Sequence, residues 1–139
     1  MAAGYLLDTN VVSETRKLRA DPRVTGFLEA ANAERLFLSV LTLGELRKGV
    51  AAKRRTDAGI ADRLALWVDE IECSFTDRVL PVDAAAARIW GELSAARSLP
   101  VVDTLIAATA MTRGLTLVTR NARDVAATGV MLLDPWAAR

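Results

Sequence analysis

Short apolar runs alternate along this chain with longer segments in which apolar residues recur every three or four positions. The short runs are typical of buried strands, and the longer segments are typical of amphipathic helices. Strands are therefore predicted at residues 4–7, 36–40, 78–82, 115–119 and 130–133. Helices are predicted at residues 10–15, 22–31, 42–53, 57–73, 84–98, 102–113 and 121–127.

The regular alternation of strands and helices predicts an α/β protein. We expect a three-layer α/β/α fold, in which a central parallel sheet of about five strands carries helices on both faces. No repeat, low-complexity segment or linker interrupts the sequence, so residues 1–139 are predicted to form a single domain.

Capping residues mark the ends of several predicted helices. Asp21, with Pro22 after it, and Asp83 are predicted N-caps, and Thr56 is the predicted N-cap of the long helix that follows it. Gly114 is the predicted C-terminal stop of the helix before it, which is apolar nearly all round and should be buried.

The composition is that of an ordinary globular protein, with 52% hydrophobic and 25% charged residues. A net charge of +1 does not by itself indicate a nucleic-acid partner. The single cysteine, Cys73, excludes a disulfide within the chain and suits a reducing compartment. Because the N-terminus shows no basic-then-apolar leader and no apolar run is as long as a membrane span, we expect a soluble, cytoplasmic protein without a membrane partner.

The absence of histidine narrows the possible chemistry most sharply. It removes Ser-His-Asp and Cys-His catalysis, and it removes histidine-based zinc, copper and iron sites. A hydrolytic reaction would therefore have to rely on carboxylates, with a hard, oxygen-binding cation as the natural partner.

Carboxylates follow several of the predicted strands. Right-handed crossovers bring the loops after parallel strands to one edge of the sheet, where ligands bind. Two carboxylates about 5 Å apart repel by roughly 3 kcal/mol at an effective dielectric constant of about 20, so a cluster indicates a bound cation, here Mg²⁺ or Mn²⁺. The residues predicted to converge are Asp8, Glu45, Asp103, Asn121 and Asp124.

Each of these acids also has a purely structural alternative. Asp8 or Asp103 could cap the helix that follows it, and Asp124 could be an ordinary surface acid. Glu45 could complete a capping box with Thr42, because the two residues have the required spacing.

Four short segments that contain these acids follow one another along the chain: residues 6–14 (LLDTNVVSE), 43–49 (LGELRKG), 102–110 (VDTLIAATA) and 118–124 (VTRNARD). They resemble the motifs of the PIN domain, and the resemblance is greatest to VapC and FitB-like toxins of bacterial toxin–antitoxin pairs. The terminal Asp134-Pro135-Trp136 is also similar to the ending of that group. The resemblance implies an endoribonuclease that depends on Mg²⁺ or Mn²⁺ and that inhibits translation or growth.

The resemblance also implies roles for individual residues. Asp8, Glu45 and Asp103 fall on the metal-binding acids of the family. The fourth acidic position is less regular, because Asn121 stands where many members have Asp, and Asp124 follows three residues later. Asn121 and Asp124 are therefore joint candidates for the fourth site residue.

Smaller polar and basic residues surround the predicted acids. The hydroxyls of Thr9 and Thr119 lie next to them in the sequence and could orient them, or could simply bond to backbone. Basic side chains around an acidic pocket suit a polyanion such as RNA. The predicted RNA contacts are Arg47, Lys48, Arg120 and Arg123, whereas residues 53–55 are expected to be solvated surface charges.

The resemblance implies three kinds of partner. The substrate would be a tRNA, an rRNA or an mRNA, and a cognate VapB-like antitoxin would bind near the active site. The toxin would form a homodimer, and a heterotetramer or larger assembly with the antitoxin.

Two alternative functions remain open. An inactive PIN-like module that binds RNA or protein is compatible with Asn121 at the fourth acidic position. A phosphatase of the aspartyl-phosphate type needs Asp-x-Asp after the first strand, but Asn10 stands where that enzyme class has its general acid.

Overall fold

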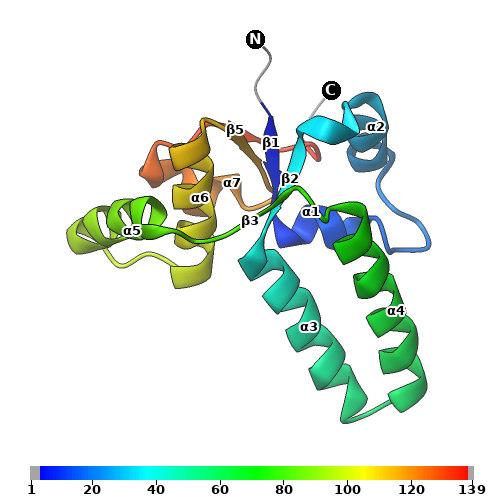
Figure 1. The fold of residues 1–139 in the computed structure, drawn as a ribbon. Helices are drawn as coiled ribbons and strands as arrows, with labels where there is room; N and C mark the ends of the chain where they lie inside the picture. Colours follow the sequence, from blue (N-terminus) through cyan, green and yellow to red (C-terminus); the bar gives the residue numbers. More distant parts are fainter. Residues whose placement is uncertain (1–3, 138–139) are drawn as a thin grey trace.

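The computed structural model describes residues 4–137, which form a five-stranded parallel sheet with helices on both faces (Figure 1). The strand order is β3-β2-β1-β4-β5, and every neighbouring pair is parallel. The predicted fold class is therefore confirmed. The strands are β1 (Tyr5–Leu7), β2 (Leu36–Ser39), β3 (Val79–Leu80), β4 (Thr116–Val118) and β5 (Leu132–Leu133).

All of the predicted helices are present, and two short 3₁₀ turns accompany them. No helix within residues 4–137 combines the length and the apolar composition that a membrane-spanning segment requires. The helices are α1 (Thr9–Glu14), α2 (Pro22–Ala30), α3 (Val40–Arg54), α4 (Ala58–Ser74), α5 (Ala84–Ala96), α6 (Val101–Arg113) and α7 (Ala122–Val125), and the 3₁₀ turns are η1 (Ala33–Arg35) and η2 (Ala126–Thr128).

The core is divided into two layers by the central strand. Successive residues of a strand point to opposite faces of a sheet. Leu7 accordingly packs with α1 to α4 through Val12, Leu46 and Val68, whereas Leu6 packs on the other face with Ile106 of α6. Helix, sheet and helix therefore form the three predicted layers.

Helices α3 and α4 form a long antiparallel hairpin that projects away from the sheet (Figure 1). At the sheet the hairpin is held by the core, since Leu46 and Val50 of α3 and Val68 of α4 are buried. Toward its tip, residues 51–59 are all exposed. The hairpin therefore offers a long solvent-facing surface that begins next to the edge of the sheet.

The ends of the helices correct three predictions and confirm three. Asp21 and Asp83 cap α2 and α5 as predicted, and Gly114 ends α6 with a φ of 65°, which favours glycine. Helix α4 is capped by Asp57 and not by Thr56, because the Asp57 carboxylate accepts from the amide of Ile60. The other two corrections concern the N-caps of α3 and α6, which are Ser39 and Pro100 and not the residues that the structural alternatives for Glu45 and Asp103 require.

The edge strands are shorter than predicted. β3 and β5 have two residues each, although runs of five and four residues were expected. Each of these strands has only one neighbour, β2 or β4, and pairing stops when the chain turns away from that neighbour. Apolar character identified these strands, but their length depends on the partner.

Substitutions at Asp57 and Thr56 test which of the two residues caps α4. Asp57→Ala should lower the free energy of unfolding by about 1 kcal/mol, because the Ile60 amide loses its acceptor. The control Thr56→Ala should lower it much less, since the exposed Thr56 hydroxyl bonds only to the Lys53 carbonyl. Urea unfolding measures both variants, and equal losses would contradict the assignment of the cap.

Candidate active site

The site lies where β1 and β4 end side by side. Leu7 of β1 is paired with Val118 of β4, so Asp8 and Thr119 emerge next to each other. The amide of Asp8 donates to the carbonyl of Val118 at 2.9 Å, which continues the sheet by one bond. The Thr119 hydroxyl then donates to Oδ2 of Asp8 at 2.8 Å in a buried environment.

Asp8 is a buried carboxylate, only 5% exposed, and both of its oxygens accept hydrogen bonds. Oδ1 accepts from the amide of Thr9 at 2.8 Å, and Oδ2 accepts from Thr119 and, at 3.4 Å, from Nδ2 of Asn10. Asp8 therefore does occupy the N-cap position of α1, as its structural alternative proposed. Capping and facing the site are compatible here, because Oδ1 accepts the capping bond from Thr9 while Oδ2 accepts from Thr119 of the neighbouring strand end.

Glu45 comes from α3 and is joined to Asp8 through Thr9. The Thr9 hydroxyl donates to Oε1 of Glu45 and also lies 3.3 Å from Oγ1 of Thr42. The capping-box alternative for Glu45 is wrong, because α3 begins earlier, with Ser39 as its N-cap. Thr42 is fully buried inside the helix, and Glu45 lies in its second turn and faces the site.

Asp103 is half-buried in the first turn of α6. Its carboxylate does not cap that helix, whose N-cap is Pro100 without a side-chain bond, so the capping alternative is wrong here too. Burial, followed by the negative charges of Asp8, Glu45 and Asp124, raises the pKa of Asp103. Four acids from distant parts of the sequence therefore share one electrostatic environment.

The two joint candidates for the fourth position behave differently. Asp124 is exposed, yet its charge helps to raise the pKa of Asp103. Asn121 is also exposed and precedes α7, where its side chain makes no capping bond. Its backbone amide donates to the Thr119 hydroxyl at 3.0 Å. The same hydroxyl donates to Asp8, so it also fixes the turn at Asn121.

Asn10 is a site residue that the sequence analysis missed. Its Nδ2 lies 3.4 Å from both Oδ2 of Asp8 and Oγ1 of Thr119, and its Oδ1 accepts from the amide of Arg120 at 3.2 Å. Asn10 thus links the end of β1 to the turn after β4. Its place two residues after Asp8, at the start of the helix that follows β1, was the signal available in the sequence.

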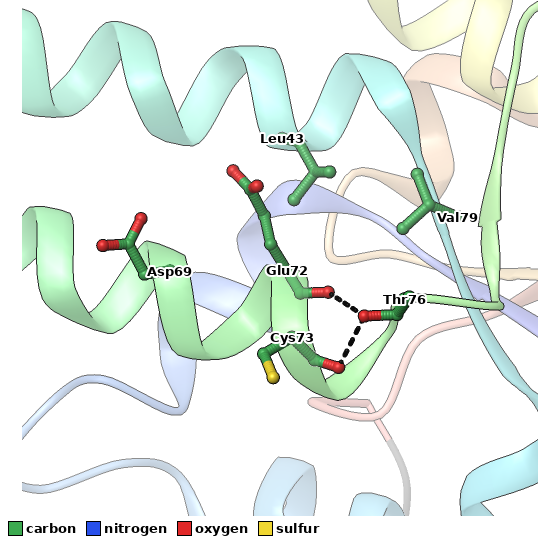
Figure 2. A pocket seen from close by; sticks show the side chains of 6 residues that line it. All are labelled: Leu43, Asp69, Glu72, Cys73, Thr76 and Val79. Carbon is green, nitrogen blue, oxygen red and sulfur yellow. Dashed lines mark hydrogen bonds between the residues drawn. The ribbon is translucent and has the colours of Figure 1, made fainter.

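The predicted RNA contacts are not equivalent in the structure. Arg47 points to α4, where it bonds Glu72 at 2.7 Å and Asp69 at 2.5 Å. Figure 2 shows these two acids on the side of α4 that faces α3, beside an open pocket of about 490 Å³. Arg47 is therefore occupied by ion pairs between α3 and α4, and it is not one of the RNA contacts that we propose.

The other three basic residues remain exposed. Lys48 lies on α3 and Arg123 on α7, and neither forms an ion pair within residues 4–137. The guanidinium of Arg120 lies 5.0 Å above the ring of Trp136, which is a cation–π contact. The terminal Asp134-Pro135-Trp136 segment therefore holds a basic side chain beside the site.

The acids suit a hard divalent cation in their chemistry. Within the part of the chain that the structure describes, none of Asp8, Glu45, Asp103 and Asp124 forms a salt bridge. No three His, Cys, Asp or Glu side chains within residues 4–137 lie close enough together to hold a metal ion by themselves. Mg²⁺ usually keeps several of its waters and takes one or two carboxylates plus substrate phosphates, so the donor set fits this ion.

Comparison with known proteins decides the family. A family model described as the PIN domain matches residues 5–129. The chain belongs to the PIN-domain family. The resemblance found in the sequence motifs is therefore confirmed over nearly the whole chain.

Curated relatives of this PIN domain include named toxins and ribonucleases. VapC ribonuclease Y4jK of Sinorhizobium fredii is 36% identical, and the match covers 94% of this chain and 96% of that protein. Toxin FitB of Neisseria gonorrhoeae is 33% identical, with 94% and 97% covered.

Solved structures agree with these relatives. The crystal structure of FitAcB from Neisseria gonorrhoeae has a TM-score of 0.87 at 31% identity and covers 96% of this PIN domain and 99% of that chain. The structure of FitAB bound to an IR36 DNA fragment has a TM-score of 0.81 at 30% identity, with 97% of each chain covered.

The role of Asn10 in the site can be tested by an isosteric change. Asn10→Asp should lower the free energy of unfolding by about 1–2 kcal/mol, because the N–H donors to Asp8 and Thr119 are lost and a negative charge is added. The control Asn32→Asp should be nearly neutral, since Asn32 only accepts from the Glu34 amide and Asp accepts equally well. Urea unfolding without divalent metal compares the two variants, and a neutral Asn10→Asp would count against the proposed link.

The raised pKa of Asp103 predicts how stability depends on pH. Because folding favours the protonated form, the charged Asp103 destabilises the metal-free protein above its raised pKa, and this effect disappears below the ordinary pKa of an aspartate. Asp103→Asn should therefore raise the Tm of the metal-free protein at neutral pH, and the gain should vanish as the pH falls.

Two further measurements make this test specific. Glu70→Gln, at an exposed position on α4, should show no comparable gain in Tm at neutral pH. Adding Mg²⁺ should raise the Tm of the wild type more than that of Asp103→Asn, because a ligand that binds only the folded state stabilises it. A lower Tm for metal-free Asp103→Asn at neutral pH would contradict the electrostatic interpretation.

Proposed function

We propose that this PIN domain is a Mg²⁺- or Mn²⁺-dependent endoribonuclease that acts as the toxin of a toxin–antitoxin pair and so inhibits translation or growth. The observation that carries the proposal is the set of carboxylates at the carboxyl edge of the sheet, which have no cationic partner within residues 4–137. The names of its relatives, among them a VapC ribonuclease and Toxin FitB, support the same activity.

Asp8, Glu45 and Asp103 would hold one or two metal ions, in part through bound waters, because no three acids within residues 4–137 lie close enough to hold an ion by themselves. The neighbouring hydroxyls set the position of two of these acids. Thr119 donates to Asp8 and Thr9 donates to Glu45, so an oxygen of each carboxylate is fixed before any ligand arrives. A bound Mg²⁺ or Mn²⁺ would lower the pKa of a water and stabilise negative charge on the phosphodiester. Prearranged ligands reduce the reorganisation that binding requires.

The fourth position is shared in the proposal by Asp124 and Asn121. Asp124 acts on Asp103 through its charge, whereas Asn121 could only offer a neutral oxygen or nitrogen. The electrostatic coupling favours Asp124 as the residue that helps to keep a cation at Asp103. Asn121, whose backbone amide donates to the Thr119 hydroxyl, is the other candidate for this position.

RNA would approach over the basic rim of the site. Lys48, Arg120 and Arg123 are exposed and can neutralise phosphates on either side of the scissile bond. The sequence contains no histidine to deprotonate a 2′-hydroxyl, so water is the nucleophile. The P–O3′ bond then breaks to leave a 5′-phosphate and a 3′-hydroxyl.

The partner in the cell would be an antitoxin of the VapB type. The similar structures include FitAB bound to a DNA fragment and VapBC-5 from Mycobacterium tuberculosis, a member of the VapBC family of toxin–antitoxin systems. We infer a cytoplasmic homodimer that assembles with its antitoxin as a heterotetramer or larger complex. The substrate class, tRNA, rRNA or mRNA, belongs to the same proposal.

Replacing the central carboxylate tests the activity. Asp8→Asn should lower Mg²⁺-dependent RNA cleavage by at least about 10²-fold, because it removes a ligand charge while keeping the size of the side chain. Excess EDTA should abolish cleavage by the wild type, and Mg²⁺ or Mn²⁺ should restore it. Gel assays with end-labelled RNA measure the rates, and the chemical ends of the products identify the nucleophile.

The controls separate this proposal from its alternatives. Asp77→Asn, at an exposed residue far from the site, should cleave like the wild type. Products with a 2′,3′-cyclic phosphate would exclude attack by water. RNA binding without cleavage by the wild type would favour the inactive PIN-like module instead.

A further inference from the structure

We propose that one face of α3 is a track for the RNA strand that leaves the active site, with Lys48 and Arg55 as phosphate contacts and Ala51 and Ala52 as its floor. This inference rests on the proposed ribonuclease function and extends it to the path of the substrate. It also revises an expectation, because Arg55 belongs to a segment that the sequence predicted to be solvated surface.

The track begins at a residue of the site itself. An α-helix turns by about 100° per residue, so Lys48, Ala52 and Arg55 lie about 20–80° from Glu45 on the same side of it around the helix axis. Lys53 lies about 80° from Glu45 on the opposite side. At 1.5 Å per residue, the distance along the axis from Glu45 to Arg55 is about 15 Å. One face of the helix therefore connects the acidic site to Arg55 over the length of a few nucleotides.

The surface of this face is hollow. Lys48, Ala51, Ala52 and Arg55 line an open cavity of about 260 Å³, and all four residues are exposed. Alanine side chains end at Cβ, so a ligand can approach the helix closely between the two longer cationic side chains. A groove with a flat floor and a cation at each end suits a sugar–phosphate backbone.

Ion pairing divides the basic residues of the hairpin between two roles. Arg47 bonds Asp69 and Glu72 of α4, and Arg54 bonds Asp62 of α4 at 2.8 Å. Lys48 and Arg55 form no ion pair within residues 4–137, although each follows one of those arginines directly. The cations turned toward α4 are therefore neutralised, and two of the three cations of residues 40–55 without an ion pair within residues 4–137, Lys48 and Arg55, lie on the proposed track.

The environment of α3 leaves this face open to a large ligand. Among the helices, α4 makes by far the most contacts with α3, and α1 touches α3 near the sheet (Figure 1). Toward the tip of the hairpin, residues 51–55 are all exposed. An RNA strand could therefore lie along the track without any rearrangement of the fold.

Salt-dependent binding of RNA tests the track directly. The probe is a fluorescent, random-sequence single-stranded RNA, titrated with protein in EDTA so that no cleavage occurs. For the double variant Lys48→Ala/Arg55→Ala, the slope of log Kobs against log [salt] should decrease in magnitude by about 1.4, which is about 0.7 for each lost phosphate contact on a single strand. The affinity at low salt should fall several-fold.

A matched control removes the same charge from other faces of the hairpin. Lys53→Ala/Arg63→Ala also deletes two exposed basic residues that form no ion pair within residues 4–137. Its salt slope should change by less than half as much. Alanine is the best helix former, so both double variants should fold, and equal Tm values would verify this.

The outcomes separate the track from the proposed function. Equal losses of RNA binding in the two double variants, or no loss in either, would overturn the track even if the wild type cleaves RNA with Mg²⁺. A track variant that binds RNA normally but loses its antitoxin or its dimer would also overturn it. If the wild type cleaves no RNA but binds it more tightly than the Lys48→Ala/Arg55→Ala variant does, the track is supported and the ribonuclease function is rejected.

Discussion

Repulsion between carboxylates at one edge of the sheet is the constraint around which this site is built. Burial and the charges of Asp8, Glu45 and Asp124 together raise the pKa of Asp103. No cationic side chain within residues 4–137 pairs with any of these four acids. Neutral donors hold two of these acids instead, since Thr119 and Asn10 donate to Asp8 and Thr9 donates to Glu45 without cancelling their charge. The negative potential is thus retained for a cation.

The basic residues are arranged to preserve that potential. Arg47 directly follows Leu46 and lies only two residues from Glu45, yet it is engaged by Asp69 and Glu72 on α4 and so does not neutralise the site. Its ion pairs join the two helices of the hairpin, while the next residue, Lys48, is exposed and forms no ion pair with any residue that the structure describes. The same helix thus carries the predicted metal ligand Glu45, an ion pair to α4 and an exposed basic side chain.

Local pattern predicted most of the fold. Short apolar runs located all five strands, and capping residues such as Asp21, Asp83 and Gly114 located helix ends, because these signals depend on residues a few positions apart. Capping signals were ambiguous where two nearby residues could each begin the same helix. Thr42 with Glu45 has the spacing of a capping box, but Ser39 caps the helix because β2 ends at that residue.

The sequence by itself determined the class of chemistry and the family, since the missing histidines and the four ordered motifs need no coordinates. Tertiary structure alone decided which side chains contact one another at the site and which basic side chains form ion pairs. The register of β1 with β4 places Thr119 against Asp8 and lets Asn10 bridge to Arg120 across more than a hundred residues. Packing of α3 on α4 decided which basic side chains are paired and which are free. Contacts of this kind depend on where the backbone brings distant residues together, and no local spacing contains that information.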